Sequence, residues 1–145
     1  MKYDDQYSTC DTTYATLRIF HEDLMPTEID KLLGVQSTSS HKRGDIISPK
    51  HPNKGLRKQG GWFLESEGHV DSKDSRRHID WLLDQVESKA TTLQKLRSQG
   101  FKIDIDCYWT SANGHGGPTI SPEQSKRLAG LEIELWFDVY FMGDD

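Results

Sequence analysis

The stretch from Leu131 to Met142, LEIELWFDVYFM, alternates between apolar residues and acidic or amphipathic ones. One parity holds Leu131, Ile133, Leu135, Phe137, Val139 and Phe141, and the other holds Glu132, Glu134, Trp136, Asp138 and Tyr140. A period of two predicts a β-strand, because successive side chains of a strand point to opposite faces of its sheet. We therefore expect a central or near-central strand of a one-sided sheet, with the apolar parity in the core.

A second segment, Phe101 to Thr110, repeats this pattern. Its apolar parity contains Phe101, Ile103, Ile105, Cys107 and Trp109, and its polar parity contains Lys102, Asp104, Asp106, Tyr108 and Thr110. The two segments predict twin strands whose polar faces lie on the same side of one sheet.

The remaining elements follow from periodicity and from capping residues. The pattern predicts strands at 14–20, 35–40 and 61–66, helices at 27–33, 71–99 and from 121 onward, and the two strands described above. This order is typical of a two-layer α+β domain with a mostly antiparallel five-stranded sheet and helices on one face. A ferredoxin-like core with an added strand fits it best.

Length and composition predict one soluble domain over residues 1–145. The chain of 145 residues is 34% hydrophobic and 28% charged, which is typical of a globular protein and not of a disordered one. No apolar run reaches the roughly 18 residues of a membrane helix, and the first residues have no signal-peptide core, so we expect a cytoplasmic protein without a membrane partner. Residues 1–12 lack periodicity and predict a loose N-terminal lead-in.

The net charge of −5 is unevenly distributed along the chain. The long loop at residues 41–60 is rich in Gly and Pro, and its 42–58 window has six basic residues against the single acid Asp45. This window therefore carries +5, and the rest of the chain carries −10. An acidic body with one basic loop attracts cationic partners to most of its surface, and direct nucleic-acid binding is not favoured.

The order and spacing of several motifs resemble the bacterial domain of unknown function family DUF4279. They are Ala-Thr-Leu-Arg-Ile from Ala15, Glu-Ile-Asp-Lys-Leu-Leu-Gly from Glu28, Lys-Arg-Gly-Asp from Lys42, Gly-Gly-Trp from Gly60, Ile-Asp-Trp-Leu-Leu from Ile79 and the final strand. The resemblance implies a small, single-domain bacterial cytoplasmic protein, of a sort that resembles the immunity proteins that neutralise toxins of competing cells. It brings no catalytic residues, and an enzyme is not the favoured interpretation.

Metal and cofactor chemistry has weak support in the sequence. None of the six histidines has the i, i+4 spacing or the Cys-x-x-Cys company of a metal site, so no metal and no cofactor is expected. The glycine-rich loop at residues 111–118 precedes a helix and is the alternative site, for a small anionic ligand or a hydrolytic reaction. Its candidate residues are Arg43, Asn113, His115 and Gly117.

The favoured site is the polar face of the twin strands. Its candidate partner-binding residues are Asp104, Asp106, Tyr108, Glu132, Glu134, Trp136, Asp138 and Tyr140. Amphipathic aromatic residues among carboxylates are typical of protein-binding surfaces, so we expect a basic protein partner, such as a toxin domain. Two other interpretations remain open: the basic loop of the same chain covers this face, or the loop of a second copy does so in a homodimer.

Overall fold

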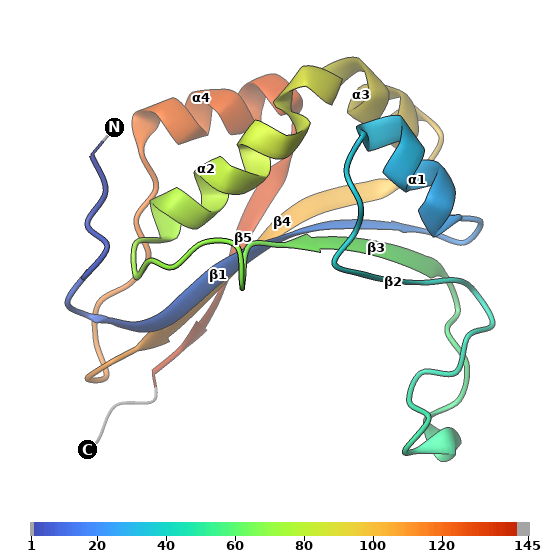
Figure 1. The fold of residues 1–145 in the computed structure, drawn as a ribbon, viewed down its shortest axis with the longest axis horizontal. Coiled ribbons are helices and arrows are strands. Elements are labelled where there is room, and N and C mark those ends of the chain that lie inside the picture. Colours follow the sequence, from blue (N-terminus) through green and yellow to red (C-terminus); the bar gives the residue numbers. More distant parts are fainter. Residues whose placement is uncertain (1, 142–145) are drawn as a thin grey trace.

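The computed structural model describes residues 2–141 of the chain, and its centre is a single mixed sheet (Figure 1). The strands are β1 (Cys10–His21), β2 (Ser39–His41), β3 (Gly60–Glu65), β4 (Lys102–Ser111) and β5 (Glu134–Tyr140). They lie in the order β2-β3-β1-β4-β5. Neighbouring strands are antiparallel except β4 and β5, which are parallel.

This topology confirms the predicted α+β fold and its ferredoxin-like core. The first four strands and the helices between them form the β-α-β-β-α-β unit, with β1 and β3 in the middle. The added strand is β5, which a helical connection brings back beside β4. A parallel neighbour requires such a crossover, because a short hairpin can join only antiparallel strands.

The α-helices all lie on one face of the sheet (Figure 1). They are α1 (Pro26–Leu33), α2 (Ser75–Val86), α3 (Ala90–Ser98) and α4 (Pro122–Leu131), with the one-turn 3₁₀ helix η2 (Glu87–Lys89) between α2 and α3. A second 3₁₀ helix, η1 (Pro52–Lys54), lies apart from this layer, in the loop between β2 and β3. The α-helices pack on the sheet. Their apolar sides and the sheet enclose one core, in which Leu17, Ile19, Trp62 and Ile105 are completely buried. No helix among residues 2–141 is long and apolar enough to cross a membrane.

The final strand is shorter than its pattern predicts, and it lies at an edge of the sheet. Leu131 ends α4, Ile133 is buried just before the strand, and β5 begins at Glu134. The central strand is β1, not the final strand. Because an edge strand has a neighbour on one side only, the apolar parity of this segment is only partly covered, with Phe137 39% and Phe141 59% exposed. The predicted central position and the predicted burial of the whole apolar parity were therefore wrong.

The N-terminal segment differs from the loose lead-in that the sequence predicts. Strand β1 already begins at Cys10, and the residues before it are bonded to the helical layer. The Asp4 amide donates to Asp74 Oδ2 at 2.7 Å, and Arg77 Nε donates to Asp5 Oδ1 at 2.8 Å. Such polar tethers have no sequence period, so pattern analysis does not detect them.

The long loop between β2 and β3 is an ordered, hairpin-like projection (Figure 1), which we call the basic arm (residues 42–59). Ile46 and Leu56 face each other across an antiparallel bridge, and Gly44 N donates to Arg57 O at 2.8 Å. The arm extends away from the helices, at the sheet edge formed by β2 and β3.

His78 of α2 has a structural role. Its Nδ1 lies 2.7 Å from Ser66 Oγ, its Nε2 lies 2.8 Å from Ser72 O, and the side chain is buried. Burial is the main cause that lowers its pKa, so the neutral ring joins the end of β3 to the start of α2.

Candidate functional site

The face of the sheet opposite the helices carries no helix, and we call it the open face (Figure 1). Strand alternation and register place on it Tyr14, Thr16, Arg18 and Phe20 of β1, Phe63 and Glu65 of β3, Lys102, Asp104, Asp106, Tyr108 and Thr110 of β4, and Glu134, Trp136, Asp138 and Tyr140 of β5. The half formed by β4 and β5 holds most of the carboxylates. This half is the surface that the sequence singles out.

The register of β4 and β5 brings the predicted residues together. Asp104 is opposite Glu134, Asp106 is opposite Trp136, and Tyr108 is opposite Asp138. Like charges at opposed positions destabilise a sheet unless cations lie between them. Asp104 and Glu134 are the like-charged pair in this register, so a cation is needed beside them.

Glu132 is the predicted site residue that does not join this surface. It is the C-cap of α4, with the left-handed φ of 55°, and its Oε2 lies 3.4 Å from Arg97 Nη2 of α3. The helix continues to Leu131, so the parity of the final strand does not extend back to Glu132. Its inclusion in the predicted site was wrong.

Arg18 supplies positive charge to the centre of the open face. Its Nε and Nη2 donate to the two carboxylate oxygens of Asp104, each at 2.7 Å. Its guanidinium carbon lies 5.1 Å from the ring centre of Trp136 and 5.3 Å from that of Phe20. The bond to Asp104 is the main cause that raises the pKa of Arg18, so this charge is fixed in place.

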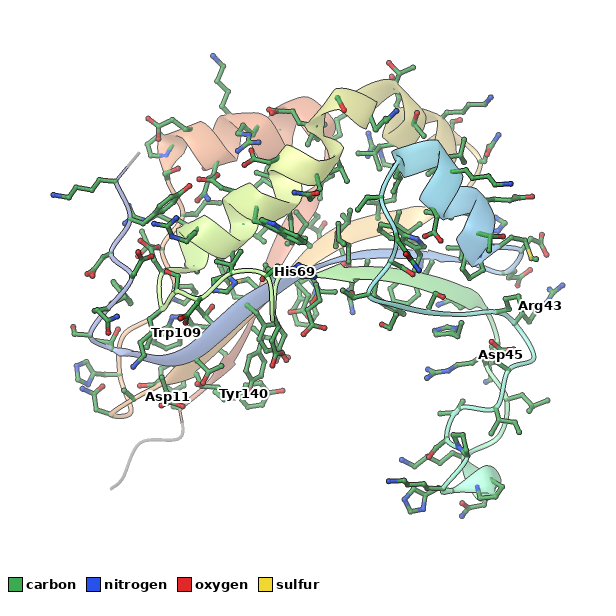
Figure 2. The ribbon with its side chains drawn as sticks, in the orientation of Figure 1. Asp11, Arg43, Asp45, His69, Trp109 and Tyr140 are labelled. Carbon is green, nitrogen blue, oxygen red and sulfur yellow. The ribbon has the colours of Figure 1, made fainter. Side chains whose placement is uncertain are left out.

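Tyrosine rings line the lower part of the same face. Tyr14 and Tyr108 stack with centroids 4.8 Å apart, and Tyr140 lies 5.4 Å from Tyr108. Tyr140 is 44% exposed, and its hydroxyl donates to Asp138 Oδ2 at 3.3 Å (Figure 2). Stacked rings with polar ends form a rigid surface that loses little side-chain entropy on binding.

Two carboxyl groups of the open face, Asp106 and Glu65, have pKa values above their ordinary ones. Burial is the main cause that raises the pKa of Asp106; Arg18 lowers it, and Asp138 and Asp104 raise it further. Asp106 Oδ1 is buried and has no hydrogen-bond donor among residues 2–141. Burial, followed by the hydrogen bond with Glu67, raises the pKa of Glu65 to about 7. A cation above this row would stabilise both groups in their charged form.

The basic arm does not cover the acidic half of the open face. The sheet order places the arm at the β2-β3 edge, and β5 forms the opposite edge. The arm's Arg43 lies 3.3 Å from Asp23 and 3.9 Å from Glu22, both in the turn after β1 (Figure 2). Within one chain, therefore, the β4-β5 carboxylates are not neutralised by the arm.

The glycine-rich loop packs on the N-terminal segment. The Tyr7 hydroxyl donates to Gly117 O at 3.1 Å, and Ser111 Oγ donates to His115 O at 2.7 Å. The amide at the start of α4 is already used, because Ser121 and Gln124 form a capping box. These bonds give the loop a structural role.

The structure does not gather the four residues of the alternative site. Asn113, His115 and Gly117 lie beyond the Cys10 end of β1, and Arg43 lies beyond its His21 end. At the usual rise of about 3.3 Å per residue, a strand of this length separates the two ends by about 35 Å. Arg43 and His115 therefore belong to different parts of the surface.

The residues of the open face and its edge that sequence reasoning missed include Tyr14, Glu65 and His41. Tyr14 and Glu65 follow from strand parity once the pairing of β1 with β3 is known, but the pairing is not readable from the sequence. His41 lies beside Gly61 at the arm's base, where a Cβ on the glycine would lie 2.6 Å from His41 Nε2. The Gly60-Gly61 pair before Trp62 is the sequence signal for this close approach of His41 to the backbone of β3.

Among residues 2–141, no cluster of three or more His, Cys, Asp or Glu could hold a metal ion.

A family model described as a domain of unknown function, DUF4279, matches residues 11–142. The chain belongs to the DUF4279 family. The matched segment spans nearly all of β1 and every other strand and helix, so the family domain includes the open face and the basic arm. No curated protein and no solved structure matches the chain, so the surface itself has to indicate what this DUF4279 domain does.

Proposed function

We propose that the chain is a non-enzymatic binding protein that occludes a basic protein domain with its acidic-aromatic sheet face. The single observation that carries this proposal is the uncovered β4-β5 half of the open face, where Asp104 stands opposite Glu134 in register and Asp106 and Asp138 act on each other as like charges. The form of activity that fits best is a cytoplasmic immunity-type inhibitor of a cationic bacterial toxin domain.

Charge supports a basic partner. Asp104 has an arginine of its own chain, whereas Glu134 and Asp138 have no ion pair among residues 2–141. A lysine or arginine of a partner would relieve the repulsion between strands and stabilise the charged form of Asp106. The long-range field of an acidic surface also speeds the encounter with a cationic protein.

The aromatic residues support protein recognition more than the binding of a small cation. Trp136, Tyr108 and Tyr140 present large and rigid side chains between the carboxylates. Tryptophan and tyrosine carry much of the binding energy of protein interfaces, and surrounding acids give orientation. An enzyme that used a hydroxyl nucleophile would need a base in contact with it, and Thr110 Oγ1 on this face instead bonds the backbone of Thr12.

The test compares two glutamates that are two residues apart. Glu134→Lys reverses a charge on the open face, and Glu132→Lys makes the same change on the α3-α4 side. The partner to measure by titration calorimetry is the product of the neighbouring gene, because an immunity protein is expected to be encoded beside its toxin. We expect Glu134→Lys and Asp138→Lys to weaken binding about tenfold or more, because each places repulsion against a basic surface.

The control variant Glu132→Lys should bind within about threefold of the wild type, because it lies outside the interface. Wild-type affinity in both face variants would refute the proposed surface. Light scattering at low and high salt shows whether a second copy of the chain occupies the open face. A dimer that dissociates on Glu134→Lys would assign the face to self-association and not to a toxin.

A further inference from the structure

A pocket of about 410 Å³ lies at the base of the basic arm, where the arm meets the β2-β3 edge of the sheet. Its lining includes Phe20, His41, Lys54, Leu56, Arg57 and Lys58. The volume is in the range of sites that hold small molecules. The basic residues of this pocket are neither part of the acidic surface nor of the glycine-rich loop.

The charged lining of this pocket is uniformly positive. Arg57 is partly buried, and neither it nor Lys54 or Lys58 forms an ion pair among residues 2–141. The arm's single acid, Asp45, accepts the amide of Lys42 with Oδ2 at 2.7 Å. A partly buried guanidinium without a counter-ion is costly, and an anion would offset that cost.

Two buried nitrogen atoms of the pocket lining also lack hydrogen-bond partners. Arg57 Nε and His41 Nδ1 are both buried, and neither has a partner within the described part of the chain. Nearly all buried polar groups in folded proteins are satisfied, so an orphaned pair at one pocket indicates a missing ligand or water. Burial, followed by the charge of Arg57, lowers the pKa of His41, so its ring adds a neutral polar group to the positive lining.

The pocket also has an apolar side, formed by Phe20 and Leu56. Phe63 packs edge-on against Phe20 with ring centroids 5.4 Å apart, which fixes the orientation of Phe20. Leu56 is 58% exposed and faces Ile46 across the arm. A ligand for this pocket therefore combines an anion with a flat or apolar part.

We propose that this pocket binds a phosphorylated small molecule with a planar part, of the chemical class of a nucleoside monophosphate. Arg57 offers the planar fork of donors that suits phosphate, and Lys54 and Lys58 supply further charge for a dianion. Phe20 and Leu56 receive the planar part. The basic residues of the pocket lie at the β2-β3 edge, and the acidic half of the open face lies at the β4-β5 edge, with Phe20 of the central strand between them. The pocket proposal therefore does not rest on the proposed protein-binding function.

Titration calorimetry with adenosine monophosphate tests the pocket directly. We expect binding of the monophosphate, and at least about tenfold weaker binding of adenosine, which lacks the phosphate. Arg57→Gln should weaken the monophosphate about tenfold or more. It should not lower the thermal unfolding midpoint, because Arg57 Nε has no hydrogen-bond partner to lose among residues 2–141.

The matched control is Lys50→Gln, which removes one positive charge from the same arm but not from the pocket lining. It should leave the affinity for the monophosphate within about twofold of the wild type. Equal losses in Lys50→Gln and Arg57→Gln would overturn the proposal, because they would show diffuse attraction of anions by the arm. Absence of binding at millimolar monophosphate would overturn it as well.

A short single-stranded oligonucleotide tests whether the phosphate that the pocket binds belongs to a free small molecule or to the end of a nucleic-acid strand. Weaker binding of the oligonucleotide than of the monophosphate supports a free ligand. Tighter binding that Arg57→Gln abolishes and Lys50→Gln preserves supports the same phosphate site, with a strand end as its ligand. Tighter binding that both variants weaken equally refutes a built site.

Discussion

Arg18 of β1 donates two hydrogen bonds of 2.7 Å to the carboxylate of Asp104 of β4, at the centre of a face that is rich in carboxylates. Both side chains are 27% exposed, so the pair is only partly shielded from solvent. Replacement by Arg18→Gln should cost about 1–3 kcal/mol of unfolding free energy at neutral pH, because a bidentate pair is lost and the carboxylates repel. Urea unfolding measures this loss.

A double-mutant cycle separates the ion pair from packing. In the Asp104→Asn background, Arg18→Gln should cost less, because the charge that Arg18 compensates is gone. The cost should also shrink as pH falls, because Asp106, whose pKa burial raises and Arg18 lowers, takes up a proton and no longer repels its neighbours. Equal losses in both backgrounds would show that the arginine acts through its contacts with Trp136 and Phe20.

Glu65 gives the stability of the fold a pH dependence near neutrality. Burial, followed by the bond with Glu67, raises its pKa from the ordinary 4.5 to about 7. A carboxyl with a raised folded-state pKa contributes its full stability below the unfolded value and loses it as pH rises through the folded value. Unfolding free energy should therefore fall between about pH 4.5 and about pH 7.5.

The variant Glu65→Gln removes this titration. It should match the wild type near pH 4.5 and exceed its stability by about 1–2 kcal/mol near pH 8, a figure reduced for the partial exposure of the group. Glu67→Gln should flatten the decline in part, because an amide can donate to the Glu65 carboxylate. Parallel pH profiles of wild type and Glu65→Gln, measured by chemical unfolding, would contradict this assignment.

Strand parity predicted the open face well. The alternation of Phe101–Thr110 and of the final strand determines which side chains share a face, because the side-chain period of a strand is fixed at two. All the predicted residues of β4 and β5 lie together for this reason. The order of strands and helices likewise restricted the fold to a ferredoxin-like core with one addition.

Features that depend on long-range contacts were not predictable in this way. Glu132 continues the alternation in sequence, but the preceding helix ends beside it and turns its side chain toward Arg97. The edge position of β5 and the separation of the basic arm from the acidic half depend on strand order, which local pattern does not encode. The pocket at Arg57 requires two arm segments to pair, which a loop-like composition conceals.

Asp74 joins the N-terminal segment to α2, and its loss should destabilise both. Its carboxylate caps the helix by accepting from Arg76 N at 3.0 Å, and it also accepts the Asp4 amide at 2.7 Å. Burial acts to raise its pKa, but bonds from Arg76 and Asp4 outweigh burial, and the net effect is a lowered pKa. Asp74→Ala should cost about 2–4 kcal/mol, read from thermal or urea unfolding.

Acid titration distinguishes the charge of Asp74 from its capping role. With a depressed folded-state pKa, Asp74 contributes stability above its ordinary value of 3.8, and this contribution disappears as pH falls through the folded value. The Asn side chain of Asp74→Asn still caps the helix, so this variant should lose only the part of the unfolding free energy that depends on the charge of Asp74. A loss in Asp74→Asn as large as in Asp74→Ala would assign the whole effect to charge.

Gly116 and Gly117 are neighbours, but we expect only Gly117 to tolerate substitution by alanine. This difference tests the structural role of the glycine-rich loop. Gly116 has a φ of 92°, and a Cβ there would collide with Thr9, whereas a Cβ on Gly117 would meet no atom within 4 Å. Gly116→Ala should therefore cost about 2–4 kcal/mol through strain and displacement of the N-terminal segment. Gly117→Ala should change stability by less than about 0.5 kcal/mol. Chemical unfolding of the two variants measures both effects, and equal tolerance at the two positions would show that the loop is not held against Thr9.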